Sequence, residues 1–414
     1  MKGELVLAEI VNLAPDVYFT GVFDPHIRTF DIIMKTANGS SYNSYVIKGS
    51  EGVMVMDTVK KEFSEDFFKK IEAVCDYREI KYIVLHHLEP DHSGALLELM
   101  DKAPQAKLII SGRAVMMLKA LLKQDVDFEI ANTGKIISLG DKTIEFLSTP
   151  FLHWPDTMSS YLHEEKILFS GDVFGSHYYD ERIFNDKVGD FDYAFGYYYE
   201  HIMRPFKQFV VQALKLYKKF EIDMIAPLHG PVLRESPQQY IDKYDKWSSD
   251  TQNKKAILGD KIVSIFYMSS YGNTQEMAKK IYEGVDSIAG IRPSMYDLGS
   301  LDERNMIDLL EESDGILIGT PTINGDAVKP AWDLLACVSY IENKGKAGGV
   351  FGSYGWTGEG TEMIQDRMRS LKFRLPLDPF RIKLIPNETE LLDSYNFGIE
   401  FAEILMGKMV EMEL

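Results

Sequence analysis

A cluster of potential metal ligands lies in the first quarter of the chain. The motif His87-x-Glu89-x-Asp91-His92 brings two imidazoles and two carboxylates together directly after the apolar run 82–85. Side chains at the end of a buried strand are held rigidly and can converge on two adjacent metal ions. A related hydrolytic pattern has histidine where Glu89 stands, and an anionic oxygen ligand moves the preference from zinc towards iron or manganese. The motif therefore indicates a redox metal centre.

Three further candidate ligands follow other apolar runs. His153 begins the segment 153–156, Asp172 follows the run 167–171, and His229 follows the run 225–228. A single histidine in such a place is usually a hydrogen-bonded structural residue. Several imidazoles and carboxylates at one sheet edge are costly to bury unless a cation compensates them, so the set predicts one metal site. His86 is adjacent to a ligand, so strand alternation points it the other way and we expect it to be structural.

Alternating strands and helices must position these residues. The first half has apolar runs typical of strands and amphipathic stretches typical of helices, and the second half repeats a strand–loop–helix rhythm that predicts a doubly wound parallel sheet. The predicted strands are 45–47, 53–56, 82–85, 107–110, 166–169, 261–267, 315–319 and 348–352, and the predicted helices are 62–74, 95–103 and 274–285. A polar stretch without apolar periodicity places the boundary near 250–258, which gives domains of residues 1–252 and 258–414.

Composition restricts the class of protein. A length of 414 residues with 45% hydrophobic and 26% charged residues predicts two globular domains. The net charge of -18 argues against nucleic acid and anionic membrane surfaces as partners. No apolar run approaches a membrane span and the first residues lack a signal-peptide layout. The two cysteines, Cys75 and Cys337, fit a reducing cytoplasm and exclude a cysteine-ligated iron–sulfur centre within this chain.

Three polar loops of the second half each follow an apolar strand. Ligands bind where such loops meet at the edge of an open α/β sheet, and the first loop, before a helix, suits a phosphate. Because this half has no G-x-G-x-x-G fingerprint, FMN is predicted rather than FAD or a nicotinamide. For Trp356, stacking on the cofactor and packing in the core both stay open. The predicted cofactor-binding residues are Ser269, Ser270, Tyr271, Gly272, Asn273, Thr274, Pro321, Thr322, Ile323, Asn324, Gly325, Ser353, Tyr354, Gly355, Trp356, Thr357 and Gly358.

The ligand order resembles that of the flavodiiron protein family, and the loops of the second half resemble those of flavodoxins. The resemblance implies an N-terminal metallo-β-lactamase-like αββα sandwich that binds two irons, followed by a C-terminal flavodoxin-like domain that binds FMN. One iron, nearer the flavin, would have the ligands His87, Glu89 and His153, and the other would have Asp91, His92 and His229. Asp172 would bridge the two irons.

The resemblance also implies a reaction. Members of this family reduce dioxygen to water with four electrons, or nitric oxide to nitrous oxide, and they form head-to-tail homodimers or dimers of dimers. The external electron donor would be rubredoxin or a reduced deazaflavin coenzyme. His177, Tyr198 and Tyr199 either place donors near the substrate or belong to an aromatic packing face. Many relatives have an aromatic residue where Pro25 stands here, which leaves the preferred gas and donor open.

Two alternatives remain at this point. The first is a binuclear hydrolase of the metallo-β-lactamase type with a flavodoxin-like appendage, and Glu89 argues against it because a zinc hydrolase would normally have histidine there. The second is an electron-transfer protein whose metal site is vestigial, and the full set of ligands argues against that.

Overall fold

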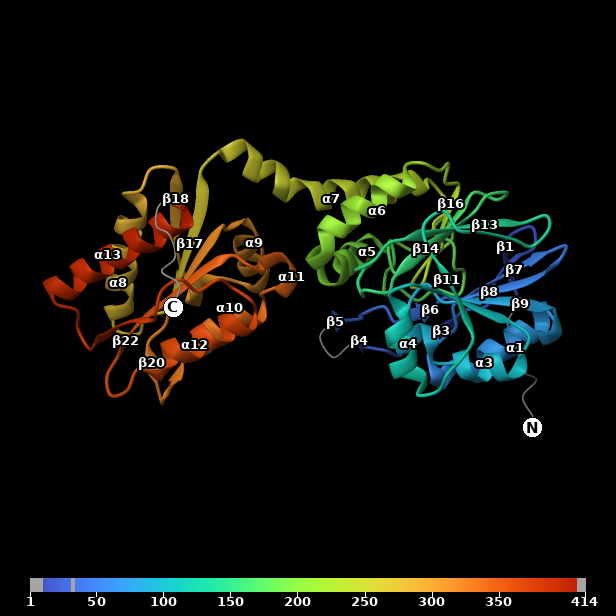
Figure 1. The fold of residues 1–414 in the computed structure, drawn as a ribbon, viewed down its shortest axis with the longest axis horizontal. Coiled ribbons are helices and arrows are strands. Elements are labelled where there is room, and N and C mark those ends of the chain that lie inside the picture. Colours follow the sequence, from blue (N-terminus) through green and yellow to red (C-terminus); the bar gives the residue numbers. More distant parts are fainter. Residues whose placement is uncertain (1–9, 31–33, 408–414) are drawn as a thin grey trace. The chain divides into compact units, whose positions relative to one another are not determined.

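The computed structural model describes residues 10–30 and 34–407, with the backbone alone for residues 250–258. The chain divides into two compact units, Met1–Ser249 and Asp250–Leu414. Helix α7 (Pro237–Leu258) passes through this division (Figure 1). The polar stretch at the boundary is helical although it lacks an apolar stripe, because no glycine and no proline after Pro237 interrupts the helix.

The first unit contains two mixed β-sheets. The larger sheet has the order β1 (Val11–Ala14), β2 (Val17–Phe19), β7 (Tyr45–Gly49), β8 (Gly52–Met56), β9 (Ile80–Val84), β10 (Lys107–Ser111) and β11 (Phe128–Ala131). The smaller sheet has the order β12 (Ile136–Ser138), β13 (Thr143–Ser148), β14 (Met158–Leu162), β15 (Ile167–Gly171) and β16 (Met224–Pro227). Two short antiparallel pairs lie beside them, β3 (Val22–Asp24) with β6 (Ser40–Tyr42) and β4 (Thr29–Phe30) with β5 (Met34–Lys35).

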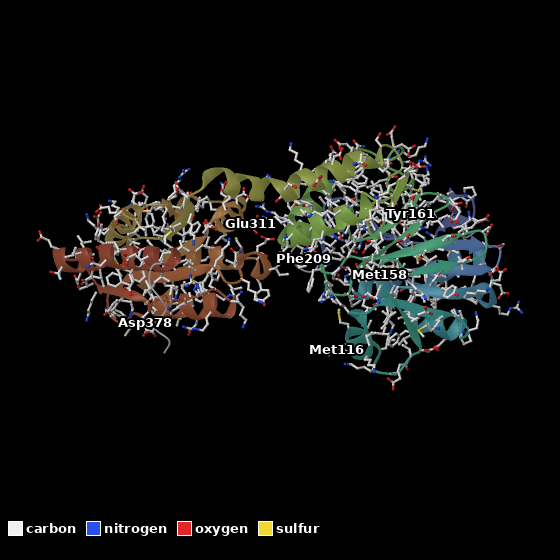
Figure 2. All side chains as sticks on the ribbon, turned by 45° about the horizontal axis from the view of Figure 1, so that its top comes forward. Met116, Met158, Tyr161, Phe209, Glu311 and Asp378 are labelled. Atoms are coloured by element: carbon white, nitrogen blue, oxygen red, sulfur yellow. The ribbon has the colours of Figure 1, made fainter. Side chains whose placement is uncertain are left out.

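The two sheets pack face to face because their strands are apolar on both sides. In β8, Met54 and Met56 lie in the core between the sheets, whereas Val53 and Val55 lie in the core beneath the helices, as the period of two in a strand requires. Along β14, Met158 likewise belongs to the inner core, and the outer core contains Tyr161 (Figure 2).

Helices cover the outer faces of both sheets (Figure 1). The helices α1 (Ser64–Val74), α3 (Leu96–Lys102) and α4 (Ala114–Leu122) pack on the larger sheet, and α6 (Lys207–Tyr217) and α7 pack on the smaller. The remaining described α-helices of this unit are α2 (Pro90–Ser93) and α5 (Asp192–Tyr198). Helix α5 continues into a π-helical turn (Tyr199–Met203). The unit is an αββα sandwich, so the predicted fold class is confirmed for this half.

The second unit is built on a parallel sheet. Its main strands follow the order β18 (Ile291–Asp297), β17 (Lys261–Tyr267), β19 (Gly315–Gly319), β22 (Ala347–Tyr354) and β23 (Phe380–Lys383), with the short hairpin β20 (Thr322–Ile323) and β21 (Asp326–Ala327) beside β22. Neighbouring residues of β17 face opposite cores, Ile265 on one side and Phe266 on the other.

Helices cover both faces of this sheet. One face packs against α8 (Asn273–Asp286) and α13 (Glu388–Leu405), and the other packs against α9 (Glu303–Glu312), α10 (Lys329–Ala336) and α12 (Glu359–Ser370). The short helix α11 (Tyr340–Asn343) precedes β22. The predicted doubly wound parallel sheet is confirmed. Within the described part of the chain, none of the helices combines the length and apolar character needed to cross a membrane.

Candidate metal centre and cofactor cavity

The loop after β9 contains four of the seven candidate ligands. His87 and Glu89 lie in the loop itself, whereas Asp91 and His92 lie on α2. The chain is helical here because Pro90 occupies the first helical position, where its fixed φ fits and its missing N–H costs nothing.

The other three candidate ligands belong to the smaller sheet. His153 lies in the turn beyond β13, Asp172 directly follows β15, and His229 follows β16. Because β15 and β16 are parallel neighbours with Gly171 opposite Pro227, the chain leaves both strands at the same edge. The strand register therefore brings Asp172 and His229 together although they are far apart in the sequence.

The structure gathers the seven side chains into two groups. The first group is His87, Glu89, His153 and Asp172, and the second group is Asp91, His92 and His229; within each group the potential ligand atoms lie within 4.8 Å of one another. In the first group, Glu89 Oε2 lies 3.0 Å from His87 Nε2 and 3.1 Å from His153 Nε2. In the second, Asp91 Oδ2 lies 3.4 Å from His92 Nε2 and 3.3 Å from His229 Nε2. Atoms bonded to one ion at about 2.1 Å lie roughly 3.0–3.5 Å apart, so these separations fit metal coordination.

Asp172 connects the two groups. Its Oδ2 lies 3.6 Å from Nε2 of both His87 and His153. Its Oδ1 lies 3.4 Å from His92 Nε2 and 3.7 Å from His229 Nε2. One carboxylate thus offers one oxygen to each group, which is the geometry required of a ligand that bridges two adjacent ions.

Burial and charge at this site call for a cation. Asp172 is 1% exposed, and neither of its carboxylate oxygens meets a hydrogen-bond partner among the described residues. Burial alone would raise the pKa of the Asp172 carboxyl, but His92 and the neighbouring imidazoles outweigh burial and hold that pKa well below its usual range. Burial alone would lower the pKa of His92, but the carboxylates of Asp91 and Asp172 outweigh burial and raise that pKa to about 9. Anionic carboxylates among buried imidazoles fit a pair of divalent metal ions.

Two groups behind the ligands were not identified from the sequence. The Nδ1 atom of His87 lies 3.3 Å from Oδ1 of Asp156, and Nδ1 of His229 donates a hydrogen bond of 2.7 Å to the main-chain oxygen of Ser41. The sequence offered one signal for Asp156, which is its position three residues after His153 in the segment 153–156. Nothing in the sequence distinguishes the carbonyl of Ser41 from any other.

His86 is turned away from both groups. Its Nδ1 lies 2.5 Å from Oδ2 of Asp57, its Nε2 lies 2.8 Å from Oγ of Ser160, and its main-chain N–H donates to Oδ1 of Asp57. All three residues are buried. This network holds the start of the ligand loop.

Two of the three residues predicted to place donors near the substrate, His177 and Tyr198, lie beside the second group. The ring centroid of His177 lies 4.9 Å from that of His229 and 5.1 Å from that of Tyr198. Ser40 Oγ lies 2.8 Å from Nδ1 of His177, whereas Nε2 is buried without a partner among the described residues. Burial first, and then His229, lowers the pKa of His177 well below its ordinary value, so the ring is neutral.

The structure does not bring Tyr199 to the site. Its hydroxyl lies 2.9 Å from Oγ of Ser248, and its ring packs 4.9 Å from the rings of both Tyr244 and Trp247. These contacts favour the packing interpretation of Tyr199 over a catalytic role. Consecutive residues of a helix point about 100° apart, so Tyr198 and Tyr199 cannot both face the same site.

The segment around Pro25 forms a local turn. Asp24 Oδ1 accepts hydrogen bonds from the main-chain N–H groups of His26 and Ile27, and His26 is exposed. A side chain on Gly39, directly before Ser40, would meet the main chain of Asp24 and Pro25. The turn is therefore packed against the segment that contains Ser40, but His26 contacts none of the candidate ligands.

A cavity in the second unit lies where the three polar loops meet. These loops follow β17, β19 and β22, at the carboxyl ends of parallel strands. The cavity is lined by Ser269, Ser270, Tyr271, Asn273, Pro321, Thr322, Ile323, Ser353, Tyr354, Gly355 and Leu384. The first loop leads into the N-terminus of α8, whose free N–H groups suit a phosphate. Leu384, which follows β23, was not predicted because its loop contributes an apolar residue rather than a polar one.

The other predicted cofactor-binding residues lie next to the lining. Thr274 is buried, and its hydroxyl lies 2.9 Å from that of Ser353, which ties the first loop to the third. Gly272 precedes α8 with a φ of +85°, and Asn324 and Gly325 form the turn between β20 and β21 with φ of +56° and +70°. These conformations favour glycine and asparagine. The remaining three are Trp356, Thr357 and Gly358, which lie beyond Gly355 in the third loop.

Trp356 is not a core residue. Its side chain is 93% exposed, and Tyr271 in the first loop is 92% exposed. Leu384 and Ile385 are also largely exposed. The core-packing interpretation of Trp356 is therefore excluded, and a group of large apolar side chains surrounds the cavity at the surface.

Family models match both units. Residues 41–230 match the model described as ODP family beta lactamase, and residues 265–398 match the model described as Flavodoxin. The candidate ligands all lie within the first match and the cavity-lining loops all lie within the second. The metal groups and the cofactor cavity thus fall in separate, recognised folds.

Proteins with both folds are similar to this chain over nearly its whole length. The type A flavoprotein FprA of Rhodobacter capsulatus is 47% identical over 98% of this chain and 93% of its own length. The flavo-diiron protein FprA2 of Clostridium acetobutylicum is 36% identical over 95% of this chain and 99% of its own. The anaerobic nitric oxide reductase flavorubredoxin of Aeromonas hydrophila is 32% identical over 95% of this chain and 79% of its own.

Solved structures agree with this similarity. The flavodiiron protein from Giardia intestinalis has a TM-score of 0.64 and 29% identity, covering 96% of this chain and 97% of its own. The rubredoxin oxygen:oxidoreductase from Desulfovibrio gigas has a TM-score of 0.65 and 25% identity, covering 97% of this chain and 99% of its own.

Proposed function

Because the chain belongs to the flavodiiron family, also called type A flavoproteins, we propose that it reduces dioxygen to water, nitric oxide to nitrous oxide, or both. FMN bound in the second unit would supply electrons, and two irons bound in the first would supply the metal chemistry that reduces the gas. The observation that carries this proposal is the carboxylate of Asp172, whose two oxygens face the two ligand groups. A shared carboxylate keeps two ions adjacent, as the binding of one diatomic molecule between them requires.

The two cofactors together supply the electrons. Four electrons and four protons convert dioxygen to two waters, and two electrons and two protons convert two nitric oxide molecules to nitrous oxide and water. In this assignment His87, Glu89 and His153 hold one iron, Asp91, His92 and His229 hold the other, and Asp172 holds both. The loops 269–274, 321–325 and 353–358 hold FMN.

The surrounding side chains keep the site dry and provide hydrogen-bond donors. Phe30 packs with ring centroids 4.3 Å from His177 and 5.6 Å from His229. The neutral ring of His177 has an unpartnered Nε2, and burial raises the pKa of Tyr198 well above its usual value, so this phenol keeps its proton. We assign His177 and Tyr198 the role of orienting the bound gas and donating hydrogen bonds to it.

Both gases are compatible with the relatives. One relative is named for nitric oxide reduction and one solved structure for oxygen reduction with rubredoxin. Rubredoxin is therefore one proposed electron donor, and a reduced deazaflavin coenzyme, which the family resemblance implies, is the other. Dioxygen and nitric oxide are compared directly in the experiment below.

We propose that a second copy of the chain packs over the exposed flavin cavity. Tyr271 and Trp356 are almost fully exposed at its rim, and Ile323, Leu384 and Ile385 add exposed apolar surface. Grouped apolar side chains of this kind mark interaction sites. In a head-to-tail homodimer, alone or as a dimer of dimers, the flavin of one chain would lie against the metal groups of its partner.

The first experiment measures cofactors and gas turnover. Protein purified without added metal should contain about two irons and one FMN per chain and should consume dioxygen or nitric oxide when FMN is reduced. Two zincs with little flavin would contradict the proposal. The ratio of the two rates, measured with the same donor, decides which gas is the substrate.

Mixing two inactive variants tests the arrangement of the dimer. An Asp172→Ala chain has intact flavin loops, and an Asn273→Trp chain, with its cofactor cavity blocked, has intact ligands. After unfolding and refolding together in equal amounts, each mixed dimer should contain one working flavin–metal pair of two if the flavin serves the partner's metals. About half of the dimers are mixed, so the mixture should recover about a quarter of the wild-type activity. Recovery limited to background would show that each chain works alone.

Glu89 distinguishes the proposed function from hydrolysis. Glu89→His should raise the ratio of bound zinc to bound iron, because imidazole is a softer ligand than carboxylate. The matched control is Glu145→Gln, an acidic residue of the same unit that contacts His163 and none of the ligands. Equal metal ratios in wild type and Glu89→His would remove ligand hardness as the reason for iron selection.

A further inference from the structure

Three imidazoles of the candidate metal centre differ in what lies behind their Nδ1 atoms. The Nδ1 atom of His87 donates a hydrogen bond of 3.4 Å to Oδ2 of Asp156 and lies 3.3 Å from Oδ1. Nδ1 of His229 donates to the main-chain oxygen of Ser41 at 2.7 Å. Nδ1 of His92 has no hydrogen-bond partner among the described residues. Of these three rings, His87 is the one backed by an anionic side chain.

Asp156 is itself held firmly. Its side chain is 1% exposed, and Oδ2 accepts a hydrogen bond of 2.8 Å from the main-chain N–H of Leu88. Its main-chain oxygen accepts a bond of 2.6 Å from the hydroxyl of Ser111. The carboxylate therefore ties the loop of His87 to the turn of His153. Two ligands of the first group depend on its position.

The contact also fixes which nitrogen of His87 can bind metal. A carboxylate accepts hydrogen bonds, so Nδ1 of His87 carries the hydrogen. Nε2 is then free to bind a metal together with the nearby carboxylates of Glu89 and Asp172. The Ser41 carbonyl acts in the same way on His229, but it has no formal charge. A carboxylate behind an imidazole makes the ring a stronger electron donor to metal.

The two metal positions are therefore unequal in charge. The first has Glu89, the shared Asp172 and, behind His87, Asp156. The second has Asp91 and the shared Asp172, and its supported imidazole, His229, faces a neutral carbonyl. Buried negative charge is weakly screened and favours the more positive oxidation state of a nearby metal.

We propose that Asp156 is a positioning residue that acts through His87 to make the first iron position the more electron-rich of the two and to retain its iron more tightly. The proposal rests on the proposed function, since it assigns the two groups to irons. With iron bound, Asp156 would thereby lower the reduction potential of the first position relative to the second.

The test uses the full-length holoprotein with Asp156→Asn and Asp156→Ala. Asparagine keeps an oxygen that can accept from Nδ1 of His87 but removes the charge, whereas alanine removes both. Reductive titration followed by electron paramagnetic resonance and Mössbauer spectroscopy measures the potentials of the two one-electron steps. A ferrous chelator measures the release of each iron.

In the asparagine variant we expect one of the two potentials to rise and one of the two irons to be released roughly 10–100-fold faster. Alanine should give at least the same changes. Unchanged potentials and unchanged iron release in the asparagine variant would overturn the proposal, even if the alanine variant loses iron.

A matched control separates this effect from that of any buried charge. Asp57 is equally buried, but its carboxylate contacts His86, which is not a ligand. Asp57→Asn should shift the two potentials less than Asp156→Asn does. An equal shift in the two variants would contradict the assignment to Asp156. A wild-type protein without two irons would instead refute the proposed function, so the two failures are distinguishable.

Discussion

The two oxygens of Asp172 face different ligands, Oδ2 towards His87 and His153 and Oδ1 towards His92 and His229. Asp172→Ala removes both oxygens at once. The variant should lose most of its iron and its gas turnover, whereas FMN should stay bound because its cavity lies in the other unit. Iron and flavin per chain are measured after purification.

The control for this variant is Asp223→Ala, which removes an exposed carboxylate directly before β16. It should keep both irons. An Asp172→Ala protein that still contains two irons and reduces gas would show that this carboxylate does not bridge them.

Tyr198 and Tyr199 are neighbours with different surroundings, and removal of each hydroxyl should have a different effect. Tyr198→Phe should lower the turnover number with little effect on stability, because this ring lies 5.1 Å from His177 at the candidate site. Tyr199→Phe should leave turnover unchanged and destabilise the first unit by about 1 kcal/mol, because the hydroxyl bonds to buried Ser248. Steady-state kinetics and urea unfolding of both variants check this, and equal kinetic effects would contradict the placement.

At the scale of elements, Lys70 on α1 connects that helix to the turn between β2 and β3. Its Nζ donates to the main-chain oxygen of Gly21 at 2.5 Å and lies 5.3 Å and 5.2 Å from the ring centroids of Phe19 and Phe23. Burial lowers the pKa of Lys70 to about 8. Because the unfolded chain has a value near 10.4, it binds more protons between about pH 8 and 10.4, and stability from this group rises with pH in that window.

Lys70→Met should therefore flatten the rise in the free energy of unfolding above about pH 8. Lys69→Met is the matched control on the same helix, because Lys69 is exposed and pairs with Glu65 and Asp66. Urea unfolding of the three proteins across this pH range measures the slopes. Equal slopes in wild type and Lys70→Met would contradict the assignment.

Strand-forming runs and the loops after them were the most predictable elements. Strands such as β8 and β17 are apolar on both faces, so their runs are unbroken in the sequence, and the loop residues that follow them are placed by the strand ends. The clustering of the seven candidate ligands and most of the cavity lining follows from this rule. The family-level resemblance added the division of the ligands into two groups.

Residues whose role depends on three-dimensional packing were not predictable. Asp156 and Ser41 act on ligands far away in the sequence, and Leu384 reaches the cavity from a loop that carries no polar signal. The exposure of Trp356 depends on which surfaces the folded chain leaves uncovered. The periodicity of apolar residues in the sequence does not predict this. The different surroundings of Tyr198 and Tyr199 were not predictable either, because an aromatic run in a helix does not reveal which ring faces the site.

At the scale of the whole molecule, each unit has its own hydrophobic core and its own cofactor residues. The first unit contains the two core clusters around its sheets, and the second contains the two on either side of its parallel sheet. All nine histidines belong to the first unit, and the cavity-lining loops belong to the second. Metal and flavin are therefore held by separately packed parts of the chain.

Separate cores imply that heat absorption during thermal unfolding should resolve into two transitions rather than one. Excess FMN at about 100 times its dissociation constant adds about 2.7 kcal/mol to the unit that binds it, which would raise one midpoint by roughly 5–10 °C. Removal of iron should lower only the other midpoint. Differential scanning calorimetry checks this, and a single transition that responds to both cofactors would contradict it. With two independent cores, each unit has its own melting temperature, and each cofactor shifts only one of them.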